Sequence, residues 1–121
     1  MPRFVLLHHV MPADAGRPDH WDFMLERDDN LATWALESRP DLSEFTSAIR
    51  LANHRLRYLD YEGPISGSRG HVTQFDSGEY RLLEENEDLV RAELRGQKLI
   101  GLATLVRSED HGHWQFTYVP D

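Results

Sequence analysis

The stretch His20–Glu26, HWDFMLE, decides the fold class of this chain, because apolar and mostly polar side chains alternate along it. A period of two is typical of a β-strand, in which successive side chains point to opposite faces. Trp21 and Phe23 then share one face, and His20 and Asp22 share the other. The sequence therefore predicts a strand that carries a histidine and an aspartate side by side.

Strand-like segments surround this one along the chain. The apolar run Phe4–His9 predicts a first strand, after which the residues 10–19 predict a loop rich in Pro, Gly and Asp. Leu31–Leu36 follows a turn at residues 28–30 and predicts a buried strand in a hairpin with His20–Glu26. Further predicted strands are His54–Tyr61, His71–Phe75, Glu79–Leu83, Leu89–Leu94, Lys98–Val106 and His113–Val119. Turn sequences that separate the later strands are Asp76-Ser77-Gly78, Arg95-Gly96-Gln97 and Asp110-His111-Gly112.

One segment has a helical pattern instead. Asp41–Ile49, DLSEFTSAI, spaces Leu42, Phe45 and Ile49 three and four residues apart and begins with a capping residue. Because it is short, we expect it to pack as a lid on a sheet. The predicted fold class is mainly all-β: a compact β-barrel of short antiparallel strands with one short helix.

Length and composition narrow the class of protein. A chain of 121 residues predicts one domain, residues 1–121, with enough core to fold without disulfides. The absence of cysteine excludes a disulfide framework and thiol catalysis. No segment predicts a membrane span or a signal peptide, so we expect a cytoplasmic protein. The net charge of −8 argues against a protein that coats nucleic acid through a broad basic surface.

The basic residues are almost all arginine, since Lys98 is the only lysine. The guanidinium group suits bidentate contact with phosphate or carboxylate. Residues 50–70 hold four arginines and two acidic residues, so this segment is locally basic. A surface that uses arginine only for solubility remains the alternative.

Two groups of residues could carry chemistry. His20 and Asp22 on one strand face, with His9 from the end of the preceding strand, could bind a divalent metal and leave positions open for water or substrate. The alternative is an ordinary solvated strand face. His54 and Tyr58, near Arg55 and Arg57, could donate hydrogen bonds to a phosphate or protonate a leaving oxygen. The alternative is a surface histidine beside a half-buried tyrosine.

The remaining histidines give weaker signals. His111 and His113 flank a glycine at a predicted turn, where solvent exposure explains them better than a site does. His71 follows a glycine-rich loop and is ambiguous.

Four blocks in order, FVLLHH, HWDFMLE, NLATWAL and NHRLRYLDYEG, together resemble the 3′-phosphoesterase domain family of bacterial DNA ligase D. The resemblance is clear from Phe4 to Gly78 and loose beyond. It implies a manganese-dependent hydrolase, although another divalent transition metal could serve. Such an enzyme removes a 3′-ribonucleoside and then the 3′-phosphate from DNA or RNA strand ends during end joining.

The resemblance also assigns roles to residues. It implies that His9, His20 and Asp22 hold the metal and that His54 and Tyr58 contact the scissile phosphate. The loop between His9 and His20 is longer than in the family, and a phosphate-binding arginine of the family is replaced here by Met24. We expect an arginine from elsewhere to replace it. The candidates are Arg17, Arg55, Arg57 and Arg69.

Three functions therefore remain open. The first is a divergent, monomeric, stand-alone phosphoesterase that acts on DNA or RNA 3′ ends, with repair ligases or polymerases as partners. The second is a catalytically weak or inactive module on the same barrel that binds nucleic-acid ends or a protein partner. The third is a metal-dependent hydrolase of small phosphodiesters. The phosphoesterase function has a geometric requirement: His9, His20 and Asp22 must converge opposite His54 and Tyr58.

Overall fold

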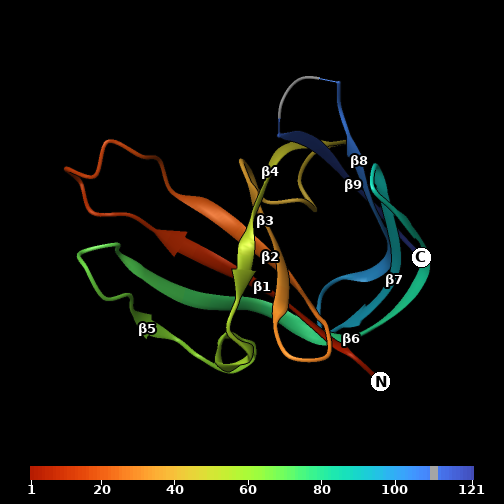
Figure 1. Ribbon diagram of the computed structural model, residues 1–121, viewed down its shortest axis with the longest axis horizontal. Helices are drawn as coiled ribbons and strands as arrows, with labels where there is room; N and C mark the ends of the chain where they lie inside the picture. The colour runs from red at the N-terminus through yellow and green to blue at the C-terminus, as the bar shows by residue number, and fades with distance from the viewer. Residues whose placement is uncertain (110–111) are drawn as a thin grey trace.

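The fold is a single antiparallel sheet in a computed structural model that describes residues 1–109 and 112–121 (Figure 1). The nine strands are β1 (Arg3–Val10), β2 (His20–Glu26), β3 (Leu31–Leu36), β4 (Thr46–His54), β5 (Gly63–Pro64), β6 (His71–Asn86), β7 (Leu89–Gly96), β8 (Ile100–Arg107) and β9 (His113–Pro120). A short 3-10 helix, η1 (Leu56–Leu59), is the one helical element of the described residues.

The sheet closes on itself. Its strand order is β1-β2-β3-β4-β9-β8-β7-β6-β5, and β1 also pairs with β6, which completes the ring. The long strand β6 pairs with β1 through its first half and with β7 through its second half. The expectation of a mainly all-β fold of antiparallel strands is confirmed, and so is the hairpin of β2 with β3.

Two apolar clusters lie on opposite faces of β1 and β2. The larger contains the alternate residues Phe4, Leu6, Phe23 and Leu25 with aromatic partners such as Trp34. The smaller cluster is formed by Val5, Leu7, Met24, Leu31, Leu59 and Val72, and residues of the 55–65 segment pack against it. Both faces of β2 are therefore buried, so His20 and Asp22 do not lie on a solvated face.

The predicted helix over Asp41–Ile49 is wrong. Residues 41–45 are irregular, and the chain then enters strand β4, which pairs with β3 and β9. Leu42 and Phe45, the apolar side of the expected helix, are 70% and 54% exposed, so no lid forms. A segment of nine residues gains little from helix formation alone, and pairing with two strands satisfies its backbone groups instead.

The predicted strand His54–Tyr61 is also wrong. Strand β4 ends at His54, and the 3-10 helix η1 follows, with its turn closed by hydrogen bonds from Tyr58 N to Arg55 O and from Asp60 N to Arg57 O. Leu59 is buried in the smaller cluster. The alternation of the sequence here reflects one buried side and one exposed side of a tight turn.

The two predicted strands His71–Phe75 and Glu79–Leu83 are parts of one strand, β6. The turn predicted at residues 76–78 is instead a bend, with a register shift opposite Leu6 and Leu7. Asp76 is buried and accepts hydrogen bonds from three backbone amides, and a Cβ on Gly78 would lie 2.1 Å from Arg95 O. These turn-forming residues therefore let one strand bend between two partners.

Four other predicted strands are observed with shifted ends: Phe4–His9, Leu89–Leu94, Lys98–Val106 and His113–Val119. A turn connects β7 to β8 near the predicted residues 95–97, but it lies at residues 97–99, because Arg95 and Gly96 still belong to β7. Of the turn expected at residues 110–112, Asp110 and His111 lie outside the described residues. In the described part of the chain no helix is long and apolar enough to cross a membrane.

Candidate metal centre and phosphate site

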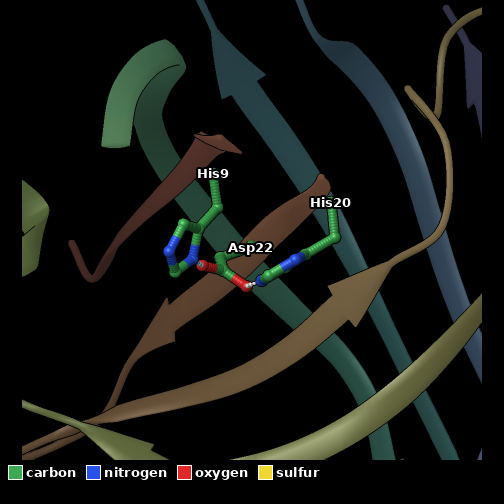
Figure 2. Close-up of side chains that lie close together, drawn as sticks. All are labelled: His9, His20 and Asp22. Atoms are coloured by element: carbon green, nitrogen blue, oxygen red, sulfur yellow. Dashed lines mark hydrogen bonds and ion pairs between the residues drawn. The ribbon is translucent and has the colours of Figure 1, made fainter. Parts of the chain in front are cut away.

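Three predicted ligands meet where β1 ends and β2 begins. His9 pairs with His20 across the two strands, and Leu7 pairs with Asp22, so all three side chains leave the same face of the sheet. One ligand atom from each lies within 4.8 Å of the other two. Figure 2 shows the Asp22 carboxylate between the two imidazole rings. His9 Nδ1 lies 3.0 Å from Asp22 Oδ2, and His20 Nε2 lies 3.3 Å from Asp22 Oδ1.

Backbone carbonyls fix the tautomers of both histidines. His9 Nε2 lies 2.7 Å from Arg69 O, and His20 Nδ1 lies 3.2 Å from Pro18 O. A carbonyl oxygen only accepts, so each of these nitrogens carries a hydrogen. In the neutral rings the opposite nitrogens, His9 Nδ1 and His20 Nε2, therefore direct lone pairs toward Asp22. Outer carbonyls of this kind orient histidines that ligate metals.

The Asp22 carboxylate has no adequate partner in that state. It is 2% exposed, and its Oδ1 makes no hydrogen bond. Three lone-pair donors that face one another in a buried space repel unless a cation lies among them. The donor set of two imidazole nitrogens and a carboxylate fits a divalent transition metal.

Protonation is the other way to neutralise this group. Burial raises the pKa of Asp22, but hydrogen bonds and positive charge from protonated His20 and His9 outweigh burial and lower it to about 2. The hydrogen bond to Asp22 in turn raises the pKa of His9 above its usual value. The site thus attracts positive charge, whether a proton or a metal ion.

His54 and Tyr58 lie together beside this group. Their rings are 5.8 Å apart at the centroids, in an edge-to-face arrangement. His54 Nδ1 donates to Ala52 O at 2.9 Å, which leaves Nε2 free to accept or, when protonated, to donate. The pair comes from the end of β4 and from η1, so a tight turn unites them where the sequence predicted a strand.

A cavity of about 290 Å³ joins the two groups. It is lined by His9, His20, Asp22, His54 and Tyr58, all five predicted residues, and by Arg17 and Arg69 at its rim. A larger cavity of about 650 Å³ shares His54, Tyr58 and Arg69 with it, and adds Arg55 and Arg57. Strand geometry predicted Arg55 and Arg57 on the face opposite His54. They instead line the same cavity as His54.

The arginines around these cavities differ from the others. Seven arginines lie within 4 Å of a carboxylate: Arg3, Arg27, Arg39, Arg81, Arg91, Arg95 and Arg107. Arg17, Arg55, Arg57 and Arg69 have no acidic partner within residues 1–109 and 112–121. Arg50 has none there either, but it donates to Thr33 O and Asn53 and lies over the Trp34 ring. Arg69 also donates to Ser66 O and Oγ, and Arg57 lies over the Tyr58 and Tyr61 rings. An acidic protein thus keeps four guanidinium groups without a carboxylate partner at one site.

Met24 forms part of the wall of the smaller cavity. It is 1% exposed and packs in the smaller apolar cluster. The position where the resemblance led us to expect an arginine is therefore apolar, while Arg17 and Arg69 approach the same cavity from two loops.

Sequence reasoning missed the backbone acceptors Pro18 O, Ala52 O and Arg69 O. Two of them precede their histidine by two residues, a local spacing that could have been noticed. The third comes from a loop 60 residues away, for which the sequence holds no signal. His71 and His113 are exposed and line neither of these two cavities, and His111 lies outside the described residues.

These features define a small all-β protein with a candidate metal site beside unpaired arginines. Residues 11–107 match the family model of the DNA ligase D 3′-phosphoesterase domain, and the chain belongs to that family. The matched range begins two residues after His9.

Longer bacterial proteins carry the similar sequences. The chain is 33% identical over 118 residues to the multifunctional non-homologous end joining protein LigD of Pseudomonas aeruginosa, with 89% of this chain and 14% of that protein covered. It is 34% identical over 114 residues to the LigD protein of Mycobacterium bovis and to that of Mycobacterium tuberculosis (strain CDC 1551 / Oshkosh), with 87% of this chain and 14% of each relative covered. The chain thus spans about one seventh of the length of the relatives it matches.

Proposed function

We propose that this protein is a metal-dependent phosphoesterase that acts on the 3′ ends of DNA or RNA strands in DNA end repair. The observation that carries the proposal is one cavity that joins a buried carboxylate between two imidazole lone pairs with His54, Tyr58 and unpaired arginines. Membership of the 3′-phosphoesterase domain family supports this choice of substrate.

His9, His20 and Asp22 would hold the metal, for which we propose Mn²⁺ or another divalent transition metal. When bound, such an ion supplies Lewis-acid polarisation of a phosphoryl oxygen and helps to activate water. The orphaned Asp22 Oδ1 and the fixed tautomers of both histidines support this ligand set.

The other residues position and protonate the substrate. Arg17 and Arg69 would neutralise the scissile phosphate, and Arg55 and Arg57 the phosphates that precede it. In the first reaction water attacks phosphorus, the bond from phosphorus to O5′ of the terminal nucleoside breaks, and His54 gives O5′ a proton. In the second, water attacks phosphorus of the remaining 3′-phosphate, the bond from phosphorus to O3′ breaks, and O3′ takes a proton, so that inorganic phosphate and a strand with a 3′-hydroxyl are released. The Tyr58 hydroxyl would donate to a phosphoryl oxygen.

The first test combines metal binding with cleavage. We expect Mn²⁺ to raise the melting temperature and to support shortening of a 5′-labelled primer–template that ends in a 3′-ribonucleoside. At a metal concentration 100 times Kd, binding adds about 2.7 kcal/mol to the free energy of unfolding. H20A should lose both effects, because it removes one of three ligands.

H71A is the matched control, since His71 is exposed and outside both cavities. It should keep the metal-induced stabilisation and the cleavage. Cleavage by H20A at the wild-type rate, or no cleavage by the wild type with any divalent transition metal, would contradict the proposed activity.

A binding module that lacks turnover is the second candidate, and Met24 is the observation that favours it. The cavity wall is apolar at Met24, where the resemblance to the family implies an arginine, so charge on the phosphate would have one fewer fixed partner. Tight binding of a 3′-phosphorylated primer–template with no release of phosphate would select this function. Repair ligases or polymerases would then act on the bound end as partners.

A further inference from the structure

A third cavity lies next to His20, on the outer face of the sheet. It has a volume of about 380 Å³, and Ala35 and Ile49 form an apolar floor. It shares His20 and Arg17 with the cavity that contains Asp22. The two cavities are therefore neighbours that share a candidate metal ligand in their lining. We call this third cavity the apolar groove.

Strand register places the apolar groove in line with the site. Asp22 pairs with Ala35, Ala35 pairs with Ile49, and Ile49 pairs with His113, so these four residues form one row across β2, β3, β4 and β9. Neighbouring strands are about 4.8 Å apart, which puts Ile49 about 10 Å from Asp22. A group attached to a phosphate at the metal site can therefore reach the floor of the groove.

The charge around the site is polarised. The described lining of the larger cavity, on the His54 side, contains Arg55, Arg57 and Arg69 and no carboxylate. The apolar groove, on the His20 side, is lined by Asp19 and Glu37, with Arg17 at the boundary that it shares with the site. The Glu37 carboxylate has no ion-pair partner in the described part of the chain. Phosphates are attracted to the first side and repelled from the second.

We propose that the apolar groove receives the leaving terminal nucleoside, while the body of the strand lies along Arg55, Arg57 and Arg69. This inference rests on the proposed function and adds the direction of the strand to it. A nucleoside has a flat apolar face for Ile49 and Ala35, hydroxyls for Ser47, Glu37 or His113, and no phosphate beyond the one that is cleaved. The leaving group is thus a single nucleoside, because a longer one would bring a second phosphate to Asp19 and Glu37.

The decisive variant is Ile49→Glu, which is placed on an exposed strand position. It should lower kcat/KM for removal of a 3′-ribonucleoside about tenfold or more. Removal of a 3′-phosphate should change less than about twofold, since that substrate has no leaving nucleoside and the groove is empty. Val106→Glu, at a similarly exposed strand position outside the three cavities, is the matched control and should leave both rates unchanged.

A second variant tests the negative charge that Asp19 and Glu37 give to the apolar groove. Glu37→Lys replaces repulsion by attraction, so we expect faster cleavage of a strand that loses a 3′-dinucleotide, relative to its rate for a single nucleoside.

Equal loss of both activities in Ile49→Glu would show a general effect on the site and would overturn the inference. Unchanged nucleoside removal would overturn it as well.

If the wild type hydrolyses neither substrate, the proposed function fails. The inference can then still be tested by the binding of oligonucleotides. NMR of the Ile49 methyl groups would then compare two oligonucleotides, one ending in a 3′-nucleoside and one ending in the preceding 3′-phosphate. A larger shift with the first supports the inference. Equal shifts, or no shift with either, overturn it.

Discussion

Two buried aspartates show how differently one residue type is used in this protein. Asp76 is 3% exposed and accepts hydrogen bonds from Gln97 N, Lys98 N and Leu99 N at 2.7 to 3.1 Å. Asp22 is 2% exposed and faces two imidazole nitrogens that carry no hydrogen in the neutral tautomers. Backbone donors satisfy the first carboxylate, and the second is a proposed metal ligand.

The same substitution should therefore have different effects on stability at the two positions. D76N should lower the free energy of unfolding by about 2–4 kcal/mol, because the amide group satisfies three buried backbone donors poorly. D22N should cost less than about 1 kcal/mol or stabilise the metal-free protein, because its new N–H group can donate to an imidazole lone pair. Urea denaturation with a chelator at about pH 8, where histidine is ordinarily neutral, measures both values.

Metal titration of the same two variants separates the roles further. D22N should lose the metal-induced rise in melting temperature, and D76N should keep it. A loss of stability in D22N as large as that in D76N would contradict the assignment of Asp22 as an unsatisfied ligand.

At the scale of elements, the loop between β5 and β6 packs against the end of β1 and orients His9. Gly70 has a φ of 81°, and a Cβ there would lie 1.9 Å from Val10 O at the end of β1. The neighbouring Arg69 carbonyl accepts from His9 Nε2. In Figure 1 this loop runs beside the β1–β2 connection, to the left of the ring. Close packing of two loops therefore orients a histidine that sequence reasoning had placed by strand position alone.

G70A should weaken metal binding about 10- to 100-fold, because the loop must move away from β1 and take the Arg69 carbonyl with it. G67A is the matched control: Gly67 has a φ of 76° in the same loop, but the nearest atom to its added Cβ is Arg69 Nε at 3.7 Å. Both variants share the backbone strain of a left-handed conformation, so their difference isolates the clash. Calorimetric titration with Mn²⁺ gives the two affinities, and equal values would refute this role of the loop.

Elements were predictable where local pattern and tertiary context agree. The period-two segment His20–Glu26 and the buried run Leu31–Leu36 are strands with the predicted ends. Asp41–Ile49 was not predictable as a strand, because its local spacing is helical and the pairing of Thr46–Ile49 with β9 overrides it. The sequence predicts a turn at the bend in β6, because Asp, Ser and Gly favour both a turn between strands and a bend within a strand. Only the partner strands distinguish a turn from a bend here.

For the whole molecule, the distribution of charge matters more than the total of −8. Seven arginines are paired with carboxylates, and four of the five arginines without one, counted over the described residues, surround the candidate site. An acidic protein can therefore bind one strand end through a local positive site while the rest of its surface repels nucleic acid.

Strand affinity should fall linearly on a log–log plot against salt concentration, with a slope set by the phosphates that are neutralised. R17Q, R55Q, R57Q and R69Q should each weaken binding of a single-stranded 3′ end, and each arginine that contacts a phosphate should reduce the slope by about 0.7. R81Q should change neither, since Arg81 already lies 3.4 Å from Glu93. Fluorescence anisotropy measures both quantities. The variant with the largest loss identifies the arginine that contributes most to phosphate binding, and four unchanged slopes would exclude this surface.

The sequence by itself determined the all-β class, the strand that places His20 and Asp22 on one face, and the family. Those features depend on local periodicity and on ordered blocks of residues, which one chain displays directly. Only the tertiary structure decided that Asp22 is buried with its Oδ1 unsatisfied, that Arg69 O orients His9, and that arginines without a carboxylate partner gather at one cavity. Such features depend on contacts between residues far apart in the chain, and ring closure and loop packing create those contacts.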